Sequence, residues 1–192
     1  QEISGVESER LNAWLYDLAL VGTHRMLGEV IRQRGDVATL QVYEDTTGLA
    51  VGEPVESLGV ALTAQLGPGL LGQVLDGVGR PLARLAELTG DFISSGARVD
   101  TLNATDRWTF TAARRPGEVV AAGDVLGSVT EQSGRAHSIL VPPRTGGTIA
   151  TLASGEYTVA DPIGSFDDGT PIALSHRWPV RIPRPAAERL PS

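Results

Sequence analysis

Histidine is the side chain here best suited to metal binding or proton transfer, and the three histidines are far apart: His24, His137 and His176. Three imidazoles can hold a zinc ion. A zinc site is usually marked in a sequence by ligands at close, regular spacing, and no two of these histidines show it. The sequence therefore favours isolated surface or hydrogen-bonded histidines over a metal site, and we expect no metal or cofactor in this chain.

Serines and carboxylates lie in turn sequences rather than in catalytic motifs. Ser94-Ser95-Gly96 and Ser133-Gly134 lack the G-x-S-x-G pattern that exposes a nucleophilic serine between a strand and a helix. The adjacent Asp167 and Asp168 precede Gly169, and Asp-Gly is a signature of two-residue hairpin turns. These residues predict turns, and we expect no catalytic residue in the chain.

Lysine and cysteine chemistry is excluded by composition. All sixteen basic residues are arginine, and there is no cysteine. The chain therefore has no Schiff-base lysine, no phosphate-binding P-loop lysine and no thiolate. Residues 116–126, with the spacing P-G-x-x-V-x-x-G-x-x-L, resemble biotinyl and lipoyl carrier domains, which attach their cofactor to a lysine. Without lysine the carrier function is excluded, whereas a similar small β-sandwich fold is not.

Charge and hydropathy argue against nucleic-acid binding and membrane insertion. The net charge is −7, whereas nucleic-acid binders use positive charge to displace phosphate counterions. The longest uncharged stretch, residues 57–75, is broken by Gly67-Pro68-Gly69, so it does not resemble a spanning helix. Residues 1–10 are polar and acidic, unlike a secretory signal. We expect a cytoplasmic protein without direct membrane insertion.

Two glycine-rich stretches are candidate phosphate loops, Gly67-Pro68-Gly69 and Gly77-Val78-Gly79. A dinucleotide site needs G-x-G-x-x-G between a strand and a helix, and neither stretch has that spacing. A short helix is predicted directly after the second stretch, from Pro81 to an end at Gly90. Weak anion binding at its N-terminus therefore stays open beside the simpler interpretation as a turn.

Short strands separated by turn signals account for most of the remaining chain. Residues 26–32 and 37–43 flank Gly35-Asp36 and predict a hairpin, within a small barrel that ends near Leu66. A second β-rich region from 102 to 174 has turn signals every 8–12 residues, which is typical of small sandwiches and barrels. After His176 the density of proline favours an extended connector over a folded element. The fold class is therefore mainly β, with two β modules and one short helix between them.

A series of motifs, in this order, resembles one known family. The motifs are Leu15-Tyr16-Asp17, Leu27-Gly28-Glu29-Val30-Ile31-Arg32, Gln41-Val42-Tyr43-Glu44-Asp45, Gly52-Glu53-Pro54-Val55, Leu66-Gly67-Pro68-Gly69-Leu70-Leu71, Asp76-Gly77-Val78-Gly79-Arg80-Pro81-Leu82, Ile139-Leu140-Val141-Pro142-Pro143, Gly155-Glu156-Tyr157-Thr158-Val159 and Trp178-Pro179-Val180-Arg181. Together they resemble the N-terminal region of the catalytic A subunits of vacuolar- and archaeal-type rotary ATPases, over about residues 15–190.

The resemblance implies a domain organisation. Residues 1–66 would form a β-barrel that packs against neighbouring B subunits, with its first strand possibly missing because residues 1–12 are polar. Residues 67–101 would be a glycine-rich connection with a short helix. Residues 102–175 would be the bulge domain, near the peripheral stalk subunits, and residues 176–192 a proline-rich connector toward an absent nucleotide-binding domain.

The resemblance also implies a function. The chain would be the assembly and stator-binding portion of a subunit whose complex couples ATP hydrolysis or synthesis to ion translocation, peripheral to the membrane. It stops before the G-x-x-x-x-G-K-[ST] phosphate loop, so ATP and Mg²⁺ would belong to the parent subunit only, and we expect this chain itself to be non-catalytic. The alternative is a free-standing β-rich protein-interaction module without enzymatic activity.

Arginines beside turns are the candidate partner-binding residues. Four of them lie in the predicted bulge: Arg114, Arg115, Arg135 and Arg144. Loops on a rigid scaffold commonly carry binding residues, so we expect these four to contact the stator. The tail carries four more, Arg177, Arg181, Arg184 and Arg189, which fit either a solvated connector or a contact with an acidic partner.

Overall fold

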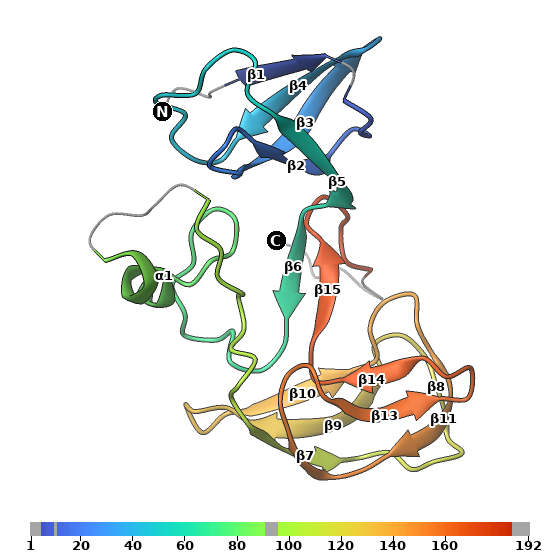
Figure 1. Ribbon diagram of the computed structural model, residues 1–192. Helices are drawn as coiled ribbons and strands as arrows, with labels where there is room; N and C mark the ends of the chain where they lie inside the picture. Colours follow the sequence, from blue (N-terminus) through green and yellow to red (C-terminus); the bar gives the residue numbers. More distant parts are fainter. Residues whose placement is uncertain (1–4, 10, 91–95, 186–192) are drawn as a thin grey trace, which may run out of the picture. The chain divides into compact units, whose positions relative to one another are not determined.

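The computed structural model describes residues 5–9, 11–90 and 96–185, and it divides into two compact units (Figure 1). Strands predominate throughout, as the sequence predicted, and the described residues contain one short helix. None of the helical structure in these ranges is long and apolar enough to cross a membrane. Unit 1 contains Gln1–Thr63, Val74–Val99 and Pro179–Arg181, and unit 2 contains Ala64–Gln73, Asp100–Trp178 and Ile182–Ser192.

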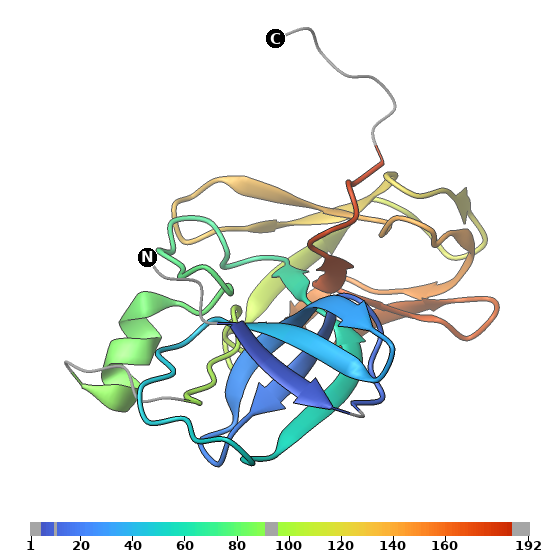
Figure 2. The same ribbon diagram turned by 90° about the horizontal axis from the view of Figure 1, so that it is seen from above.

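Unit 1 is built on a five-stranded antiparallel sheet. Its strands are β1 (Gly5–Glu9), β2 (Asp17–Val21), β3 (Met26–Arg34), β4 (Val37–Val42) and β5 (Val55–Ala61), in the spatial order β1-β4-β3-β2-β5. In the view of Figure 2 these blue to teal strands curve around a shared interior. That interior is apolar because alternate residues of each strand point inward: Ala19, Val21, Met26, Val30, Ala38, Leu40 and Val42 are buried together.

The predicted hairpin is confirmed. β3 and β4 pair in antiparallel register up to Arg34 opposite Val37, and the turn between them contains Gly35 at a φ of 55°. Glycine adopts this left-handed conformation without the steric cost that a Cβ would impose. The local sequence was sufficient here because turn and strand signals agree.

The expectation that the first strand is missing is wrong. β1 forms from the polar N-terminal residues and pairs along β4, with Val6 opposite Leu40. An edge strand is held mainly by backbone hydrogen bonds, so polar side chains do not prevent it. Val6 also packs against the core of unit 1.

The short helix is also confirmed. α1 (Leu82–Thr89) begins after Pro81, ends at Gly90, and buries Leu85 completely. Proline suits a helix start because its φ is already near the helical value, and Gly90 ends the helix at a φ of 73°. Residues 67–101, expected as one connection, are divided: Val74–Val99 belong to unit 1 and Ala64–Gln73 to unit 2.

Unit 2 is built on two four-stranded antiparallel sheets that share one core. The first has the order β10-β9-β7-β12 and the second β14-β13-β11-β8. The strands are β7 (Trp108–Ala112), β8 (Val119–Val120), β9 (Val125–Thr130), β10 (Ala136–Leu140), β11 (Gly147–Leu152), β12 (Gly155–Tyr157), β13 (Pro162–Phe166) and β14 (Pro171–Ala173). Phe110 and Leu126 from the first sheet and Ile149 and Ile163 from the second are buried in a single cluster. Asp168-Gly169 forms the predicted turn, since Asp168 accepts a hydrogen bond from the N–H of Thr170.

The start of the proline-rich tail is folded, which corrects the prediction of an extended connector. β15 (His176–Pro179) pairs with β6 (Thr63–Leu66) in a two-stranded sheet. The indole of Trp178 in this strand is buried, and its Nε1–H donates to the carbonyl of Ile182 at 2.7 Å, in the residues that follow the strand. Proline is compatible with this strand because it occupies the last position. Arg189 lies outside the described residues.

Glycine at position 164 is required by the close approach of two strands. A Cβ at Gly164 would overlap the carbonyl of Thr151 on the neighbouring β11, whereas a Cβ at Gly77 would meet nothing within 4 Å. We predict that Gly164→Ala destabilises unit 2 by about 2 kcal/mol, because rigid backbone must shift to admit the methyl group. Gly77→Ala is the control and should change stability by less than about 0.5 kcal/mol. Urea unfolding followed by circular dichroism would measure both, and equal midpoints for the two variants would contradict the packing argument.

Candidate functional site

The most buried charge in unit 1 is the carboxylate of Glu29, in the middle of β3. Its side chain is fully shielded from solvent. Arg181 binds both of its oxygens, with Nε at 2.9 Å from Oε1 and Nη2 against Oε2. The hydroxyl of Tyr43 donates to Oε2 at 2.9 Å. The guanidinium of Arg181 lies 4.5 Å from the ring centroid of Tyr16. Glu29 thus meets a bidentate arginine, the arrangement that best compensates a buried carboxylate.

These contacts fix the protonation states of the cluster. The hydrogen bond from Arg181 outweighs burial and holds the pKa of Glu29 below its ordinary 4.5. Burial, followed by the hydrogen bond to Glu29, raises the pKa of Tyr43 to about 12. Near neutral pH Glu29 is therefore ionised and Tyr43 is a donor. The cluster lines an open hollow of about 490 Å³ together with Leu62 and Val180.

The contacts of this cluster hold one segment of the chain, Val180 and Arg181, in place. The N–H of Val180 donates to the carbonyl of Leu62 at 3.0 Å, and Arg181 follows with its bonds to Glu29. Tyr16 stands at a φ of 72°, which is unusual for an aromatic residue and is maintained only by surrounding contacts. We call Glu29, Tyr43, Tyr16 and Arg181 the Glu29 clasp.

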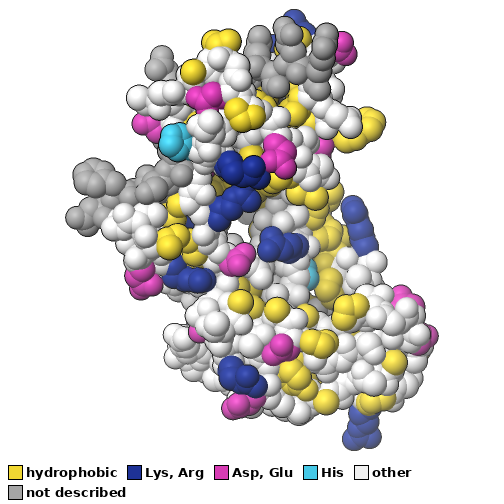
Figure 3. Space-filling model, viewed as in Figure 1, with side chains coloured by type: hydrophobic (Ala, Val, Ile, Leu, Met, Phe, Trp, Pro, Cys, Tyr) yellow, Lys and Arg dark blue, Asp and Glu magenta, His cyan; other side chains and the backbone are white. Residues whose placement is uncertain are grey.

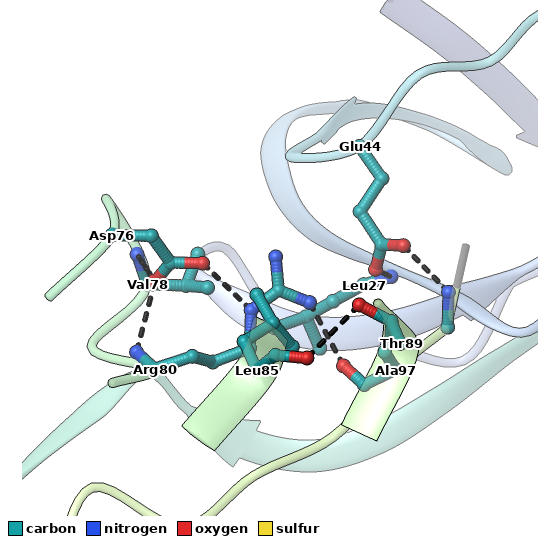
Figure 4. A network of polar contacts seen from close by, with 9 residues as sticks. Leu27, Glu44, Asp76, Val78, Arg80, Leu85, Thr89 and Ala97 are labelled. Atoms are coloured by element: carbon teal, nitrogen blue, oxygen red, sulfur yellow. Dashed lines mark hydrogen bonds and ion pairs between the residues drawn. The ribbon is translucent and has the colours of Figure 1, made fainter. Parts of the chain in front are cut away.

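A second polar network in unit 1 explains the glycine-rich motif of residues 76–82 (Figure 4). Asp76 Oδ1 accepts from the N–H groups of Val78 and Arg80, at 3.0 and 2.8 Å. Its Oδ2 receives Arg80 Nε at 2.7 Å, and Arg80 Nη1 donates to the carbonyl of Ala97 at 2.8 Å. Burial raises the pKa of Asp76, but the hydrogen bonds from Arg80 and Val78 outweigh it and the net shift is downward. The N–H groups of Val78 and Arg80 are therefore bound by a carboxylate of the chain itself, as in a turn.

The carboxylate of Glu44 holds a further segment of unit 1, at Gly96, in place. It accepts from the N–H of Leu27 at 3.0 Å and from the N–H of Gly96 at 2.6 Å (Figure 4). The position of Gly96 also explains its identity, because a Cβ there would overlap the carbonyl of His24. Ser94 and Ser95 lie outside the described residues.

Unit 2 has its own buried carboxylate, Glu131, which is 5% exposed. Both of its oxygens accept from the N–H of Gly69, at 3.1 and 3.2 Å, and Oε1 lies 2.8 Å from His137 Nδ1. The Gly67-Pro68-Gly69 stretch is therefore held by a protein carboxylate across 62 residues of sequence. Ser133-Gly134 lies in the turn between β9 and β10.

The three histidines do not converge. His24 is exposed in unit 1, His137 is bound to Glu131, and Nε2 of His176 accepts from Arg184 Nη1 at 2.8 Å. Burial, and then the charge of Arg184, lowers the pKa of His176, which keeps it the neutral acceptor. No group of three or more potential metal ligands occurs within residues 5–9, 11–90 and 96–185.

The four predicted partner-binding arginines are all at strand ends of unit 2 but do not form one group. Arg114 is 3.4 Å from Glu118, Arg115 is exposed in the following turn, and Arg144 lies 5.5 Å from the ring of Trp178. Arg135 lies in the β9–β10 turn.

Strand register decides which of these arginines are neighbours. Ala112 at the end of β7 pairs with Gly127, and Leu140 at the end of β10 pairs with Val125, so the residues after both strands leave the same end of the sheet. Arg114, Arg115 and Arg144 follow these ends. Arg135 precedes β10, where Ala136 pairs with Thr130, and lies at the opposite end. On the face shown in Figure 3 the charges over β7–β14 are scattered rather than continuous.

The sequence alone did not reveal the contacts that Glu29, Glu131 and Arg181 make. Glu29 gave one signal, a carboxylate within the apolar first half of a predicted strand, which suggests a buried partner. The partner itself was not recognisable, because Arg181 is 152 residues away and resembled any other arginine of the tail.

The Glu29 clasp predicts a pH-dependent loss of stability. Arg181→Met leaves the buried Glu29 without its cation and should destabilise the protein near pH 7. In the wild type the depressed pKa contributes stability above about pH 4.5 that is lost as pH falls through the folded pKa. In the variant only the hydrogen bond from Tyr43 opposes the effect of burial, so the pKa of Glu29 rises, and the stability difference between the proteins should shrink as the pH is lowered from 7 toward the folded pKa of the wild type. Urea unfolding across this range measures it.

Arg25→Met is the matched control, because Arg25 pairs with Glu56 at 2.9 Å while both side chains remain more than half exposed. An exposed pair contributes little, so this variant should lose less than about 1 kcal/mol at every pH. If Arg181→Met lowered the free energy of unfolding no more than Arg25→Met does, Arg181 would not compensate the charge of Glu29.

Comparison with known proteins agrees with this architecture. Residues 10–59 match the family model described as ATP synthase alpha/beta family, beta-barrel domain. Residues 99–181 match the ATP synthase alpha/beta subunit barrel-sandwich domain. The two matches follow each other in the order of the two units.

Whole-protein relatives give the same result. The chain is 50% identical over 176 residues to an A-type ATP synthase A subunit of Methanospirillum hungatei, covering 92% of this chain and 30% of that protein. It is 48% identical over 179 residues to the V-type ATP synthase alpha chain of Anaeromyxobacter dehalogenans, covering 93% and 31%. With the A-type ATP synthase A subunit of Methanothrix thermoacetophila it shares 44% over 187 residues, covering 97% and 32%. The chain thus spans just under a third of the length of these curated relatives. It belongs to the ATP synthase alpha/beta family and corresponds to an N-terminal portion of the A subunit, or alpha chain, of A-type and V-type ATP synthases.

Proposed function

We propose that this chain is the assembly and stator-binding part of the catalytic A subunit of a rotary ATPase, whose complex couples ATP hydrolysis or synthesis to ion translocation. The observation that supports this most is the succession of the two family domains in a chain that is up to 50% identical to A-type subunits. On this proposal ATP and Mg²⁺ are bound by a part of the parent subunit other than the described residues, and the complex is cytoplasmic and peripheral to the membrane.

The buried charges of both units support a structural rather than a catalytic role. Glu29, Asp76 and Glu131 each accept hydrogen bonds from groups that hold a loop or strand in place. A general acid or base needs a proton that it can exchange with a substrate, within hydrogen-bond reach. These carboxylates are instead engaged by arginine, histidine or backbone amides, and the result is a rigid scaffold.

Unit 1 offers a surface for a neighbouring B subunit. Trp14, Leu15 and Tyr16 are consecutive and exposed by 79%, 47% and 40%. Aromatic residues are enriched in protein interfaces because they bury large area at a small cost in conformational entropy. The outer strands β1 and β5 add backbone groups at the two sides of the sheet. We assign these residues to contacts within the ring of subunits.

Unit 2 offers a surface for the peripheral stalk. Arg115 and Arg144 are exposed at the same end of the sandwich, with Arg114 beside them. The arginine guanidinium binds carboxylates through two parallel hydrogen bonds, so an acidic partner suits this surface. Arg135 is a separate candidate at the other end.

Charge reversal tests the stalk surface. We predict that Arg115→Glu with Arg144→Glu, made in the full-length protein that carries this chain, lowers its retention of peripheral-stalk subunits in a pull-down at least tenfold, because attraction to carboxylates becomes repulsion. Arg107→Glu is the control, since Arg107 is also exposed but lies just before β7, at the other end of that strand from Arg114 and Arg115. Unchanged retention in the double variant, or a loss in Arg135→Glu alone, would show that this end of unit 2 is not the stalk surface.

A further inference from the structure

Unit 2 contains an apolar groove that the proposed function does not use. It has a volume of about 240 Å³ and lies between β10 and the residues that follow β14. Its floor includes Leu66, Ile139 and Leu174, of which Ile139 and Leu174 are buried in the core. Leu71 and Leu140 stand at its rim and are exposed by 61% and 39%. Exposed leucines beside an apolar depression are typical of a surface that a partner covers.

The groove runs along the outer edge of a strand. β10 is the outermost strand of its sheet, and four consecutive residues from His137 to Leu140 line the groove. Side chains of a strand alternate between its two faces, so consecutive residues share one lining only where the strand edge itself forms the wall. Outer strands present unpaired N–H and C=O groups on that side, which are able to pair with another extended chain.

One end of the groove is positively charged. Arg184 lines it and donates from Nη1 to His176 Nε2, with its guanidinium 5.4 Å from the ring of Trp178. This leaves donors on its other nitrogen atoms. No carboxylate is among the groove residues of the described chain, and no ion pair of Arg184 is found there. His137, which also lines the groove, is bound through its Nδ1 to Glu131.

We propose that this groove binds an extended segment of a partner polypeptide, which adds as a strand to the outer edge of β10. A large apolar side chain of that segment enters the groove between Leu140 and Leu174, and a carboxylate of the segment binds Arg184. This is strand addition, in which backbone hydrogen bonds supply affinity and side-chain pockets supply specificity. The groove adjoins the arginine surface proposed for the stalk, since Arg144 and Arg184 lie 5.5 and 5.4 Å from the ring of Trp178, but its proposal does not depend on the stalk proposal.

Strand addition fits the groove better than a small molecule does. The groove contains a strand edge, an apolar floor and one cation, Arg184. These match, in turn, the backbone, the apolar side chains and the carboxylates of a peptide in which apolar and acidic residues alternate. The spacing of side chains along such a peptide places every second one toward the same face. A compact ligand would use the floor and Arg184 but not the edge of β10.

Peptide titration of the chain tests the proposal. The probe is the capped heptapeptide TEVLVET, and the comparison peptides are TKVLVKT, with lysine for glutamate, and TEVLVET with N-methylated backbone amides. We expect binding of the first peptide, with amide NMR shifts at residues 137–140 and 173–176, and at least fivefold weaker binding of each comparison peptide. Equal binding of all three peptides, no binding of the first at millimolar concentration, or shifts elsewhere would overturn the proposal.

Two variants locate the contacts. Arg184→Gln should weaken binding of the acidic peptide at least fivefold and Leu71→Ser at least threefold, whereas Arg107→Gln, an exposed arginine of the same unit outside the groove, should change it less than twofold. Circular dichroism confirms that each variant is folded. Equal affinities for the Arg184→Gln and Arg107→Gln variants would show that Arg184 does not bind the peptide.

Discussion

The ion pair between Glu29 and Arg181 is the interaction on which unit 1 depends, because it joins positions 152 residues apart. Glu29 is fully buried in β3, and Arg181 belongs to a short segment of unit 1 that follows Asp100–Trp178 of unit 2 in the chain. A buried carboxylate is costly to fold unless a well-placed cation compensates it. The pair therefore makes the integrity of unit 1 conditional on the correct course of the chain through unit 2.

Three other carboxylates also hold segments of the chain in place through hydrogen bonds. Asp76 holds the loop before α1, Glu44 holds the segment at Gly96, and Glu131 holds Gly69 within unit 2. In each case a carboxylate accepts backbone N–H groups: Asp76 those of Val78 and Arg80, Glu44 those of Leu27 and Gly96, and Glu131 that of Gly69. Charge-assisted hydrogen bonds of this kind are stronger than neutral ones.

Local sequence predicted those parts of the fold that local forces determine. The β3–β4 hairpin, α1 between Pro81 and Gly90, and the Asp168-Gly169 turn were predicted because their turn chemistry and periodicity agree. β1 and β15 were not, since both are held by pairing with distant strands and carry polar or proline-rich sequence.

Of the candidate site, the sequence predicted exposed arginines at strand ends but not their grouping. The separation of Arg135 from the other three follows from strand register, which single-sequence patterns do not determine. The partners of Glu29 and Glu131 could not be predicted for a similar reason: any of sixteen arginines was an equal candidate for Glu29, and the backbone N–H of Gly69 that binds Glu131 lies 62 residues away in the sequence.

The most direct measurement of the central interaction is the pKa of the Glu29 carboxyl in the intact chain, obtained from its ¹³C chemical shift during a pH titration. If Arg181 compensates the buried charge, the pKa lies below 4.5. A pKa above that value would mean that burial prevails and that the clasp between Glu29 and Arg181 does not hold unit 1 together.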